Sequence, residues 1–289
     1  YDRNNDKSIY IERNPSDLMN ILFSSGTTGD PKAIPWTHST PIKCAIDGYL
    51  HQNITSHDTV CWPTNLGWMM GPWLLFQMIN GCSIALYDGP PTTSNFCSFV
   101  TNSNVSCLGL VPSIVSAWKN NTTINNNVWD HDWSNITRFS SSGEASDENT
   151  MLWLSSRVSG YAPIIEYCGG TELAGSYMSS SMVQPNAPAT FSTPILGVQF
   201  CIIDEEAEKL LYDTNYNNNN NKSTTTTTTT TTNNNNSDNN SDNISGEVAL
   251  CPPSLGFSTK LLNRDHNEAY YDIDIKGSND NILRRHGDE

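Results

Sequence analysis

Apolar segments of two kinds alternate along most of the chain. Short runs rich in branched and aromatic residues predict strands at residues 17–23, 59–62, 83–87, 105–111, 138–141 and 163–167. Apolar residues three or four apart predict helices between them, at residues 40–50, 73–79, 96–100, 112–118 and 149–158. Because strands and helices take turns, we expect an α/β fold with a largely parallel sheet and crossover helices. In such a sheet, ligand-binding loops lie at the carboxyl ends of the strands.

The first predicted helix has one clear apolar face. It begins at Thr40 and Pro41, because proline is favoured in the first helical turn. The residues at helical spacing on its apolar face are Ile42, Ala45, Ile46, Tyr49 and Leu50. The helix is therefore expected to be amphipathic, and the polar segment before it lies between a strand and a helix.

The pattern changes after residue 198, where short strands are predicted at residues 198–203 and 247–250. Between them, residues 215–243 are almost entirely Asn, Thr, Ser and Asp, and they supply much of the low mean hydropathy of −0.46. Such a tract has no apolar surface to offset the entropy of ordering. We expect a disordered insertion within a short β-rich segment, although an aggregation-prone or interaction segment is an open alternative.

Charge and cysteine content restrict the classes of partner. The formal net charge of −15 argues against nucleic-acid and anionic-membrane partners, which need a basic face. No apolar run is long enough to span a bilayer, and no signal-peptide pattern is seen. The eight cysteines are scattered singly without metal-ligand spacing, which favours reduced, buried thiols. We therefore expect a cytoplasmic protein, with peroxisomal or mitochondrial targeting left open because a targeting tail would lie beyond Glu289.

Residues 24–32, Ser-Ser-Gly-Thr-Thr-Gly-Asp-Pro-Lys, combine the features of a phosphate-binding loop. Gly26 and Gly29 allow backbone N–H groups to converge on an anion, and the hydroxyls add donors. Lys32 adds a mobile point charge suited to terminal phosphates. The sequence does not fit the Walker A spacing, and an ordinary surface turn has the same composition.

Four other segments carry candidate chemistry, and each has a plainer alternative. Thr171 and Glu172 end a predicted strand, but a Thr-Glu pair also caps helices. Residues 141–144 fit a turn between strand and helix, and residues 65–71 contain Trp and Met that are more often core. Residues 285–288 end in a Gly-Asp pair that is common in turns.

Taken together and in this order, the five segments resemble motifs of the adenylate-forming superfamily of acyl-CoA synthetases, adenylation domains and luciferases. Residues 24–32 resemble its S-S/G-G-T/S-T-G-x-P-K loop, and residues 167–172 resemble its Y-G-x-T-E motif. The resemblance is nearest to acetyl-CoA-synthetase-like members and covers nearly the whole chain except the Asn/Thr tract and the first residues. It implies that residues 1–214 are the central part of the AMP-binding large domain and residues 244–289 its end. A smaller mobile domain with a catalytic lysine would belong to the complete protein.

The resemblance implies the substrates ATP, Mg²⁺, a carboxylic acid and CoA, and it assigns residues to the nucleotide. Lys32 would hold the departing pyrophosphate, Thr171 the α-phosphate and Glu172 the metal. Asp288 would bind the ribose, and Gly143 and Glu144 would lie against the nucleotide. Cys168 stands where the family has an aromatic ring on adenine. The remaining phosphate-loop residues are Ser24, Ser25, Gly26, Thr27, Thr28 and Gly29.

The resemblance also implies an acyl pocket, formed by Trp68, Met69, Met70, Ser142 and Gly169. Acetyl-CoA synthetases have a tryptophan at the position of Gly169 that closes the pocket. Glycine there predicts a deeper pocket and a preference for butyrate or longer acids, unless neighbouring side chains refill the space. The predicted function is activation of a carboxylic acid to an acyl adenylate, with transfer to CoA in the complete enzyme. The alternatives are an adenylation domain serving a carrier protein and an inactive remnant or binding module.

Overall fold

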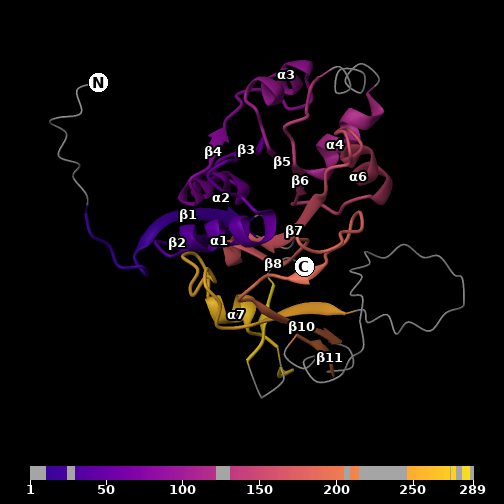
Figure 1. Cartoon of the computed structure of the whole chain (residues 1–289). Coiled ribbons are helices and arrows are strands. Elements are labelled where there is room, and N and C mark those ends of the chain that lie inside the picture. The colour runs from indigo at the N-terminus through magenta and orange to yellow at the C-terminus, as the bar shows by residue number, and fades with distance from the viewer. Residues whose placement is uncertain are drawn as a thin grey trace, which may run out of the picture.

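The computed structural model describes residues 11–24, 30–121, 131–204, 209–214, 246–273, 275–277 and 282–286. The Asn/Thr tract at residues 215–243 lies outside these ranges, so its disorder stays a prediction. The described elements lie around a seven-stranded sheet, with a four-stranded sheet and a two-stranded hairpin beside it (Figure 1). No described helix is long and apolar enough to cross a membrane.

The seven-stranded sheet has the order β4-β3-β5-β6-β7-β8-β9. Its strands are β3 (Thr59–Cys61), β4 (Ser83–Ala85), β5 (Cys107–Leu110), β6 (Arg138–Ser141), β7 (Ile164–Gly170), β8 (Gly175–Ser179) and β9 (Thr193–Pro194). Neighbours from β4 to β7 are parallel, which confirms the largely parallel sheet. Strands β8 and β9 run antiparallel and were not predicted, because their Gly- and Ser-rich sequence lacks an apolar run.

Helices cover both faces of this sheet. Val60 packs on the side of α1 (Thr40–Gln52) and α2 (Met70–Phe76), the latter continued by η1 (Gln77–Asn80). The next residue, Cys61, packs on the other side, in the core that contains residues of α3 (Ser94–Asn102), α4 (Pro112–Asn120) and α6 (Glu148–Ser155). Cys107 and Leu108 divide between the two cores in the same way. A strand that is buried on both faces has a continuous run of apolar residues. The parallel part of the sheet could therefore be predicted from the sequence.

Helix α1 turns three residues of its predicted apolar face outward, whereas Ala45 of the same face is buried. Ile42, Tyr49 and Leu50 are 49%, 54% and 43% exposed in this chain. The buried face contains the polar residues Lys43, Asp47, His51 and Gln52. The predicted helix is confirmed, but the side chains that attach it to the sheet are mainly polar. Burial of such groups is tolerated only where they find partners.

The segment before α1 is a β-hairpin, where the sequence predicts a strand leading to a helix. Strand β1 (Leu18–Ser24) pairs antiparallel with β2 (Lys32–Thr37), and Ser24 faces Lys32 at the end of the pair. Strand β2 was missed because it contains a proline. The loop at residues 25–29 therefore connects two strands of a separate hairpin, although those residues lie outside the described ranges.

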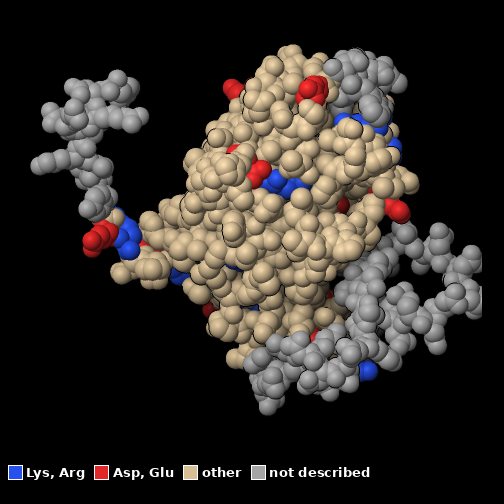
Figure 2. All heavy atoms as spheres, in the orientation of Figure 1, with Lys and Arg blue, Asp and Glu red and all other residues tan. Residues whose placement is uncertain are grey.

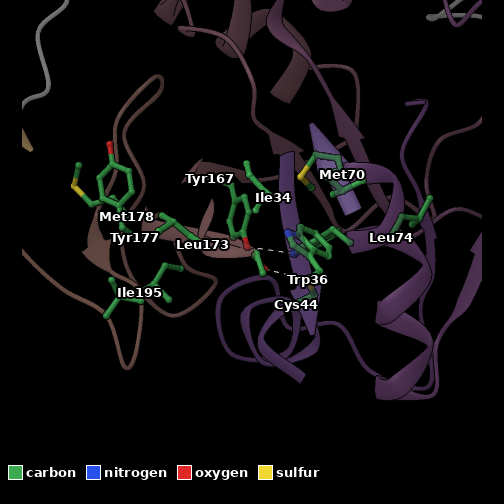
Figure 3. Packing of buried hydrophobic residues seen from close by; sticks show 14 of the residues in the cluster. Ile34, Trp36, Cys44, Met70, Leu74, Tyr167, Leu173, Tyr177, Met178 and Ile195 are labelled. Carbon is green, nitrogen blue, oxygen red and sulfur yellow. Dashed lines mark hydrogen bonds between the residues drawn. The ribbon is translucent and has the colours of Figure 1, made fainter. Parts of the chain in front are cut away.

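The predicted β-rich segment near the C-terminus is confirmed as an antiparallel sheet of order β11-β10-β12-β13. Its strands are β10 (Gln199–Asp204), β11 (Lys209–Asp213), β12 (Glu247–Cys251) and β13 (Arg284–Arg285). The helix α7 (His266–Tyr270) lies between β12 and β13 in the chain. Phe200 and Leu250 belong to the same buried cluster as β1, β2 and α1 (Figure 3 shows part of it). The three sheets therefore share a core.

All eight cysteines are free thiols, seven of them buried. This agrees with the predicted reduced state. Figure 2 shows one face of the molecule, on which the described Lys and Arg side chains lie scattered rather than gathered in a basic patch. The face gives no support to nucleic-acid binding.

The orientation of α1 can be tested by substitution. In the 289-residue chain, Tyr49→Ser is expected to change the free energy of unfolding by less than about 0.5 kcal/mol, because the ring is exposed. Phe139→Ala, at a fully buried position of β6, is expected to lower it by about 3 to 5 kcal/mol. Urea unfolding measures both. A loss above about 1 kcal/mol for Tyr49→Ser would show that its ring is packed against other parts of the chain.

Candidate active site

Two cavities meet at the carboxyl ends of β6 and β7. The first, of about 410 Å³, is lined by the segment after β6 and by residues of β7 and β8. The second, of about 590 Å³, extends from the same segment toward β1 and the start of α2. Both are lined by Ser142, Gly143, Glu144 and Gly169. This is where ligand loops are expected in a parallel sheet.

Lys32 and Glu172 form a buried ion pair at the edge of the second cavity. Lys32 Nζ lies 3.4 Å from Glu172 Oε1, and the two side chains are 9% and 1% exposed. The Tyr270 hydroxyl donates to the same carboxylate oxygen at 3.1 Å, and its ring centroid lies 5.1 Å from Lys32 Nζ. The sequence predicts a mobile lysine, whereas the structure holds it against a carboxylate. Tyr270 is a site residue that sequence reasoning missed.

The turn that carries Thr171 and Glu172 is fixed from several sides. The η2 turn (Thr171–Leu173) follows β7 directly. The next residue, Ala174, has a φ of +54°, which is unusual for a residue with a side chain. The Trp36 indole donates to the Thr171 carbonyl at 2.8 Å, and the Ser258 N–H donates to the Glu172 carbonyl at 2.7 Å. Glu172 is therefore placed by its backbone as well as by its ion pair.

The ends of the β1–β2 hairpin bring Ser24 close to the same place. Ser24 lines the second cavity, and its hydroxyl has no hydrogen-bond partner among the described residues. On the other side of the hairpin loop, the Asn263 amide accepts from Ala33 N–H at 2.9 Å and donates to the Pro31 carbonyl at 2.7 Å. The predicted loop residues Ser25, Gly26, Thr27, Thr28 and Gly29 lie outside the described residues, as does Asp288.

Gly143 and Glu144 line both cavities at the end of β6. Gly143 has a φ of +91°, a backbone conformation that favours glycine. The Glu144 carboxylate accepts from the Ser113 N–H at 2.8 Å and from its hydroxyl at 2.9 Å, at the start of α4. The segment is thus a turn, as its plainer interpretation holds, and the turn forms a wall of both cavities.

Glu166 is a second buried carboxyl group, in β7, that sequence reasoning did not select. Its side chain lines the first cavity, its Oε2 accepts from the Ser146 hydroxyl at 2.9 Å, and its Oε1 has no partner among the described residues. Burial raises the pKa of Glu166 to about 7, although hydrogen bonds from the Ser146 and Ser141 hydroxyls lower it. An acidic residue inside an otherwise apolar strand was the available signal.

Tyr167 and Cys168 point to opposite sides of β7, as neighbouring strand residues do. The Tyr167 ring is 2% exposed, and its centroid lies 5.7 Å from that of Trp73 in the core (Figure 3). Cys168 lines the first cavity with its thiol 3.2 Å from the Tyr177 hydroxyl. The aromatic lining of this cavity comes instead from Tyr177 and Phe191, which sequence reasoning missed.

The predicted acyl-pocket residues all line the second cavity: Trp68, Met69, Met70, Ser142 and Gly169. Trp62, Val111 and Ile114 complete its apolar wall. The expectation that Gly169 deepens this cavity stays a prediction. A Cβ at Gly169 would lie 1.9 Å from the Gly175 carbonyl oxygen, so glycine there also allows the close approach of β8.

The described residues contain no group of three His, Cys, Asp or Glu side chains that could hold a metal ion. A magnesium ion does not need one, because it is commonly bound by one or two carboxylates together with substrate phosphates and water. The single buried carboxylate of Glu172, beside Thr171 and Lys32, fits that kind of site.

Comparison with known proteins identifies the family of the chain. A profile described as AMP-binding enzyme matches residues 3–215. The probable acyl-activating enzyme 17, peroxisomal, of Arabidopsis thaliana is 43% identical over 281 residues, which are 97% of this chain and 34% of that protein. Hexanoyl-CoA synthase of Cannabis sativa is 43% identical over 273 residues, 93% of this chain and 33% of that protein. The chain therefore spans about a third of the length of these relatives.

The fold comparison agrees. Acetoacetyl-CoA synthetase from Streptomyces lividans superposes with a TM-score of 0.70 at 21% identity, over 92% of this chain and 37% of that structure. The similar structure shows the fold of the large domain of adenylate-forming enzymes, and the family profile covers most of the chain. The chain belongs to the AMP-binding family of the adenylate-forming superfamily.

Proposed function

We propose that this chain activates a carboxylic acid with ATP as part of an acyl-CoA synthetase. The observation that carries the proposal is the Lys32–Glu172 ion pair beside Thr171, at the edge of a cavity that joins a second one. An acyl adenylate has an adenosine end and an acyl end joined by one phosphate. The two connected cavities, with Lys32, Thr171 and Glu172 at the edge of the second, match the shape and charge of such a molecule.

In the proposed reaction, a carboxylate oxygen of the acid attacks the α-phosphorus of ATP. The new bond is the mixed anhydride, and the bond that breaks releases pyrophosphate with its electron pair. Thr171 lines the second cavity, two residues after Gly169, which lines both. It would donate to an α-phosphate oxygen, while Lys32 would neutralise the pyrophosphate as its charge develops. Such catalysis consists mainly of positioning and charge stabilisation.

Glu172 would hold Mg²⁺, which neutralises phosphate charge when bound. The Lys32–Glu172 pair is relevant here, because the ammonium group lies 3.4 Å from this buried carboxylate. Attraction between the opposite charges opposes the cost of burying the carboxylate. Lys32 thus supports the group on which metal binding would depend.

The first cavity would take the adenine. The free Oε1 of Glu166 is an acceptor inside a cavity with aromatic lining, and an exocyclic amino group is the donor that would satisfy it. Tyr177, whose ring lies 4.6 Å from that of His286, supplies an aromatic surface that Cys168 lacks. The base would therefore be recognised by one carboxyl oxygen and by packing against rings.

The second cavity would take the acid. Its lining is largely apolar, with Trp62, Met69, Met70, Val111 and Ile114, and a cavity of this kind suits an aliphatic chain. The name of the Cannabis relative, hexanoyl-CoA synthase, favours an acid of medium length. CoA would be the acceptor in the complete protein, and delivery to a carrier protein is the alternative. A peroxisomal location, which the names of two relatives carry, is the rival to the cytoplasm.

The metal-binding role of Glu172 predicts a large loss of activity on Glu172→Gln. Exchange of labelled pyrophosphate into ATP by the full-length protein is expected to fall by about 100-fold or more, because the ionised metal ligand is lost. Glu268→Gln, at an exposed position of α7, is the matched control and should retain full exchange. Parental exchange in Glu172→Gln would refute the assignment.

The raised pKa of Glu166 predicts a pH-dependent stability. The folded state retains a proton between the ordinary value of 4.5 and about 7, so the free energy of unfolding should fall as pH rises through this window. Glu166→Gln should remove this loss. At pH 8, its free energy of unfolding, measured with urea, should exceed that of the parent by on the order of 2 to 3 kcal/mol. At pH 5 the difference should be much smaller.

The control for this measurement is Glu12→Gln, which removes a carboxylate from an exposed position. An equal stabilisation by both substitutions at pH 8 would show that net charge, rather than burial of Glu166, is responsible. A Glu166→Gln difference that does not depend on pH would contradict the raised pKa.

The apolar second cavity predicts a preference for longer acids. Each further buried methylene contributes about 0.8 kcal/mol, so kcat/KM should rise several-fold per carbon from acetate until the cavity is filled. Val111→Phe should shorten the cavity and move the preference toward butyrate and acetate, whereas Leu152→Phe, on an exposed face of α6, should not. An acetate preference in the parent would contradict the assignment of this cavity.

A further inference from the structure

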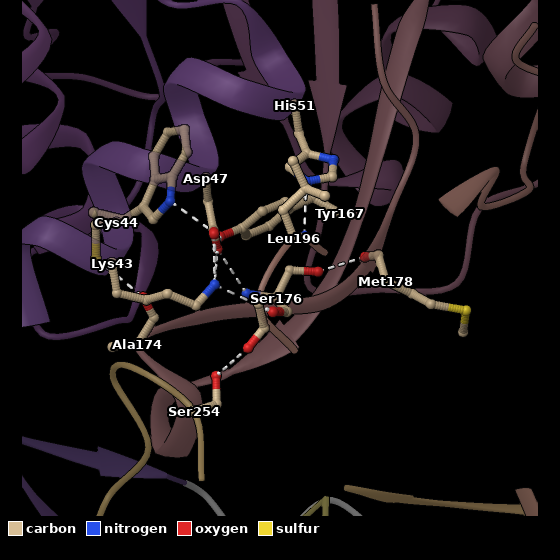
Figure 4. Close-up of polar contacts among 12 residues, drawn as sticks. Lys43, Cys44, Asp47, His51, Tyr167, Ala174, Ser176, Met178, Leu196 and Ser254 are labelled. Atoms are coloured by element: carbon tan, nitrogen blue, oxygen red, sulfur yellow. Dashed lines mark hydrogen bonds and ion pairs between the residues drawn. The ribbon is translucent and has the colours of Figure 1, made fainter. Parts of the chain in front are cut away.

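Helix α1 carries a buried ion pair beneath the turn that holds Thr171 and Glu172. Lys43 and Asp47 are one helical turn apart, their side chains are 3% and 0% exposed, and Lys43 Nζ lies 2.5 Å from the Asp47 carboxylate. Neither residue lines the two cavities described above. The pair is directed at the sheet rather than at solvent (Figure 4).

The Asp47 carboxylate connects α1 to two strands. Its Oδ2 accepts from the Tyr167 hydroxyl at 2.7 Å and from the Ser176 N–H at 3.2 Å (Figure 4). Lys43 Nζ donates to the Ser176 carbonyl at 3.4 Å, and the Trp73 indole donates to the Tyr167 hydroxyl at 3.2 Å. Tyr167 is followed in β7 by Cys168, and Ser176 lies in β8, so the pair holds the strands that enter and leave the turn.

The same helix also contacts the turn itself. The Cys44 thiol lies 3.1 Å from the Ala174 carbonyl, and Ala174 is the residue with the positive φ. The next residue, Gly175, approaches the ion pair so closely that a Cβ would lie 2.4 Å from Asp47 Oδ2. The backbone from Thr171 to Ser176 therefore rests directly on Lys43, Cys44 and Asp47.

Stability alone does not account for a charged pair at this place. Replacing a buried ion pair with apolar side chains of similar volume is often neutral or stabilising, because desolvation opposes the attraction between the charges. Charged groups do, however, form short, directional hydrogen bonds, and buried networks of them restrict the backbone to one arrangement. The Asp47 carboxylate and the Lys43 ammonium group form hydrogen bonds with the two strands that flank the turn.

We propose that Lys43 and Asp47 are positioning residues for the phosphoryl chemistry, acting through Tyr167 and β8 on the turn that carries Thr171 and Glu172. The inference rests on the proposed function, because the turn matters only if Thr171 and Glu172 act on phosphate and metal. A small displacement of a metal ligand lowers the rate of the chemical step. None of the residues from Thr171 to Ala174 lines the first cavity, so adenine bound there would make no direct contact with the turn.

The test compares kinetic constants of full-length variants in pyrophosphate exchange. Lys43→Met and Tyr167→Phe should each lower kcat by about tenfold or more and raise the Mg²⁺ concentration for half-maximal exchange. The KM for ATP should change by less than about threefold, since the adenine contacts remain. If Lys43→Met does not fold, Tyr167→Phe, which removes one oxygen atom, decides the matter.

Two controls separate positioning from stability. Asp58→Asn weakens another buried ion pair, in which Arg138 Nη2 lies 3.0 Å from Asp58 Oδ1 at the opposite ends of the strands. It should lower the melting temperature and leave kcat and the Mg²⁺ requirement unchanged. The double variant Lys43→Met/Asp47→Leu should recover the melting temperature but not kcat.

The outcomes distinguish this inference from the proposed function. A parent protein without exchange activity would overturn the proposed function, and the inference with it. An active parent, with Lys43→Met and Tyr167→Phe equal to Asp58→Asn in kcat and Mg²⁺ requirement, would overturn the inference alone. Full recovery of kcat in the double variant would likewise show that the pair serves only stability.

Discussion

The candidate site is built on Glu172, a carboxylate that is almost completely buried and so needs polar partners inside the protein. Lys32 approaches it from the hairpin, Tyr270 donates to it from α7 and Ser258 fixes its backbone. These partners come from three separate parts of the chain, so the site exists only when the two smaller sheets pack against the large one. The shared core of hairpin, α1, β7 and β10 provides that packing.

The change of strand direction after β7 explains how the two cavities come to meet. Parallel strands bring Ser141 and Glu166 to one edge, and the antiparallel return of β8 brings Tyr177 beside Cys168. The return requires close approach at Gly169 and Gly175, where side chains would collide with β8 or with Asp47. Glycine at these positions therefore allows the turn that displays Thr171 and Glu172.

The parallel sheet could be predicted because each strand is a continuous apolar run, as in residues 105–111. Strands β2 and β8 could not, since proline, glycine and serine hide them. Lys32 and Glu172 were found because both belong to long motifs. Glu166, Tyr177 and Tyr270 were missed because their roles arise from contacts between segments distant in sequence. The outward apolar face of α1 shows the same limit, since spacing alone does not say which face is covered.

In the proposed function, the two cavities form one site for an acyl adenylate. The most direct measurement is equilibrium binding of hexanoyl-sulfamoyl adenosine, a stable mimic of that intermediate, to the full-length protein. A ligand that fills both cavities should bind at least about 100-fold more tightly than ATP or hexanoate, because it gains the contacts of both without paying twice for association. Binding no tighter than that of ATP would contradict the proposal that the two cavities form one site.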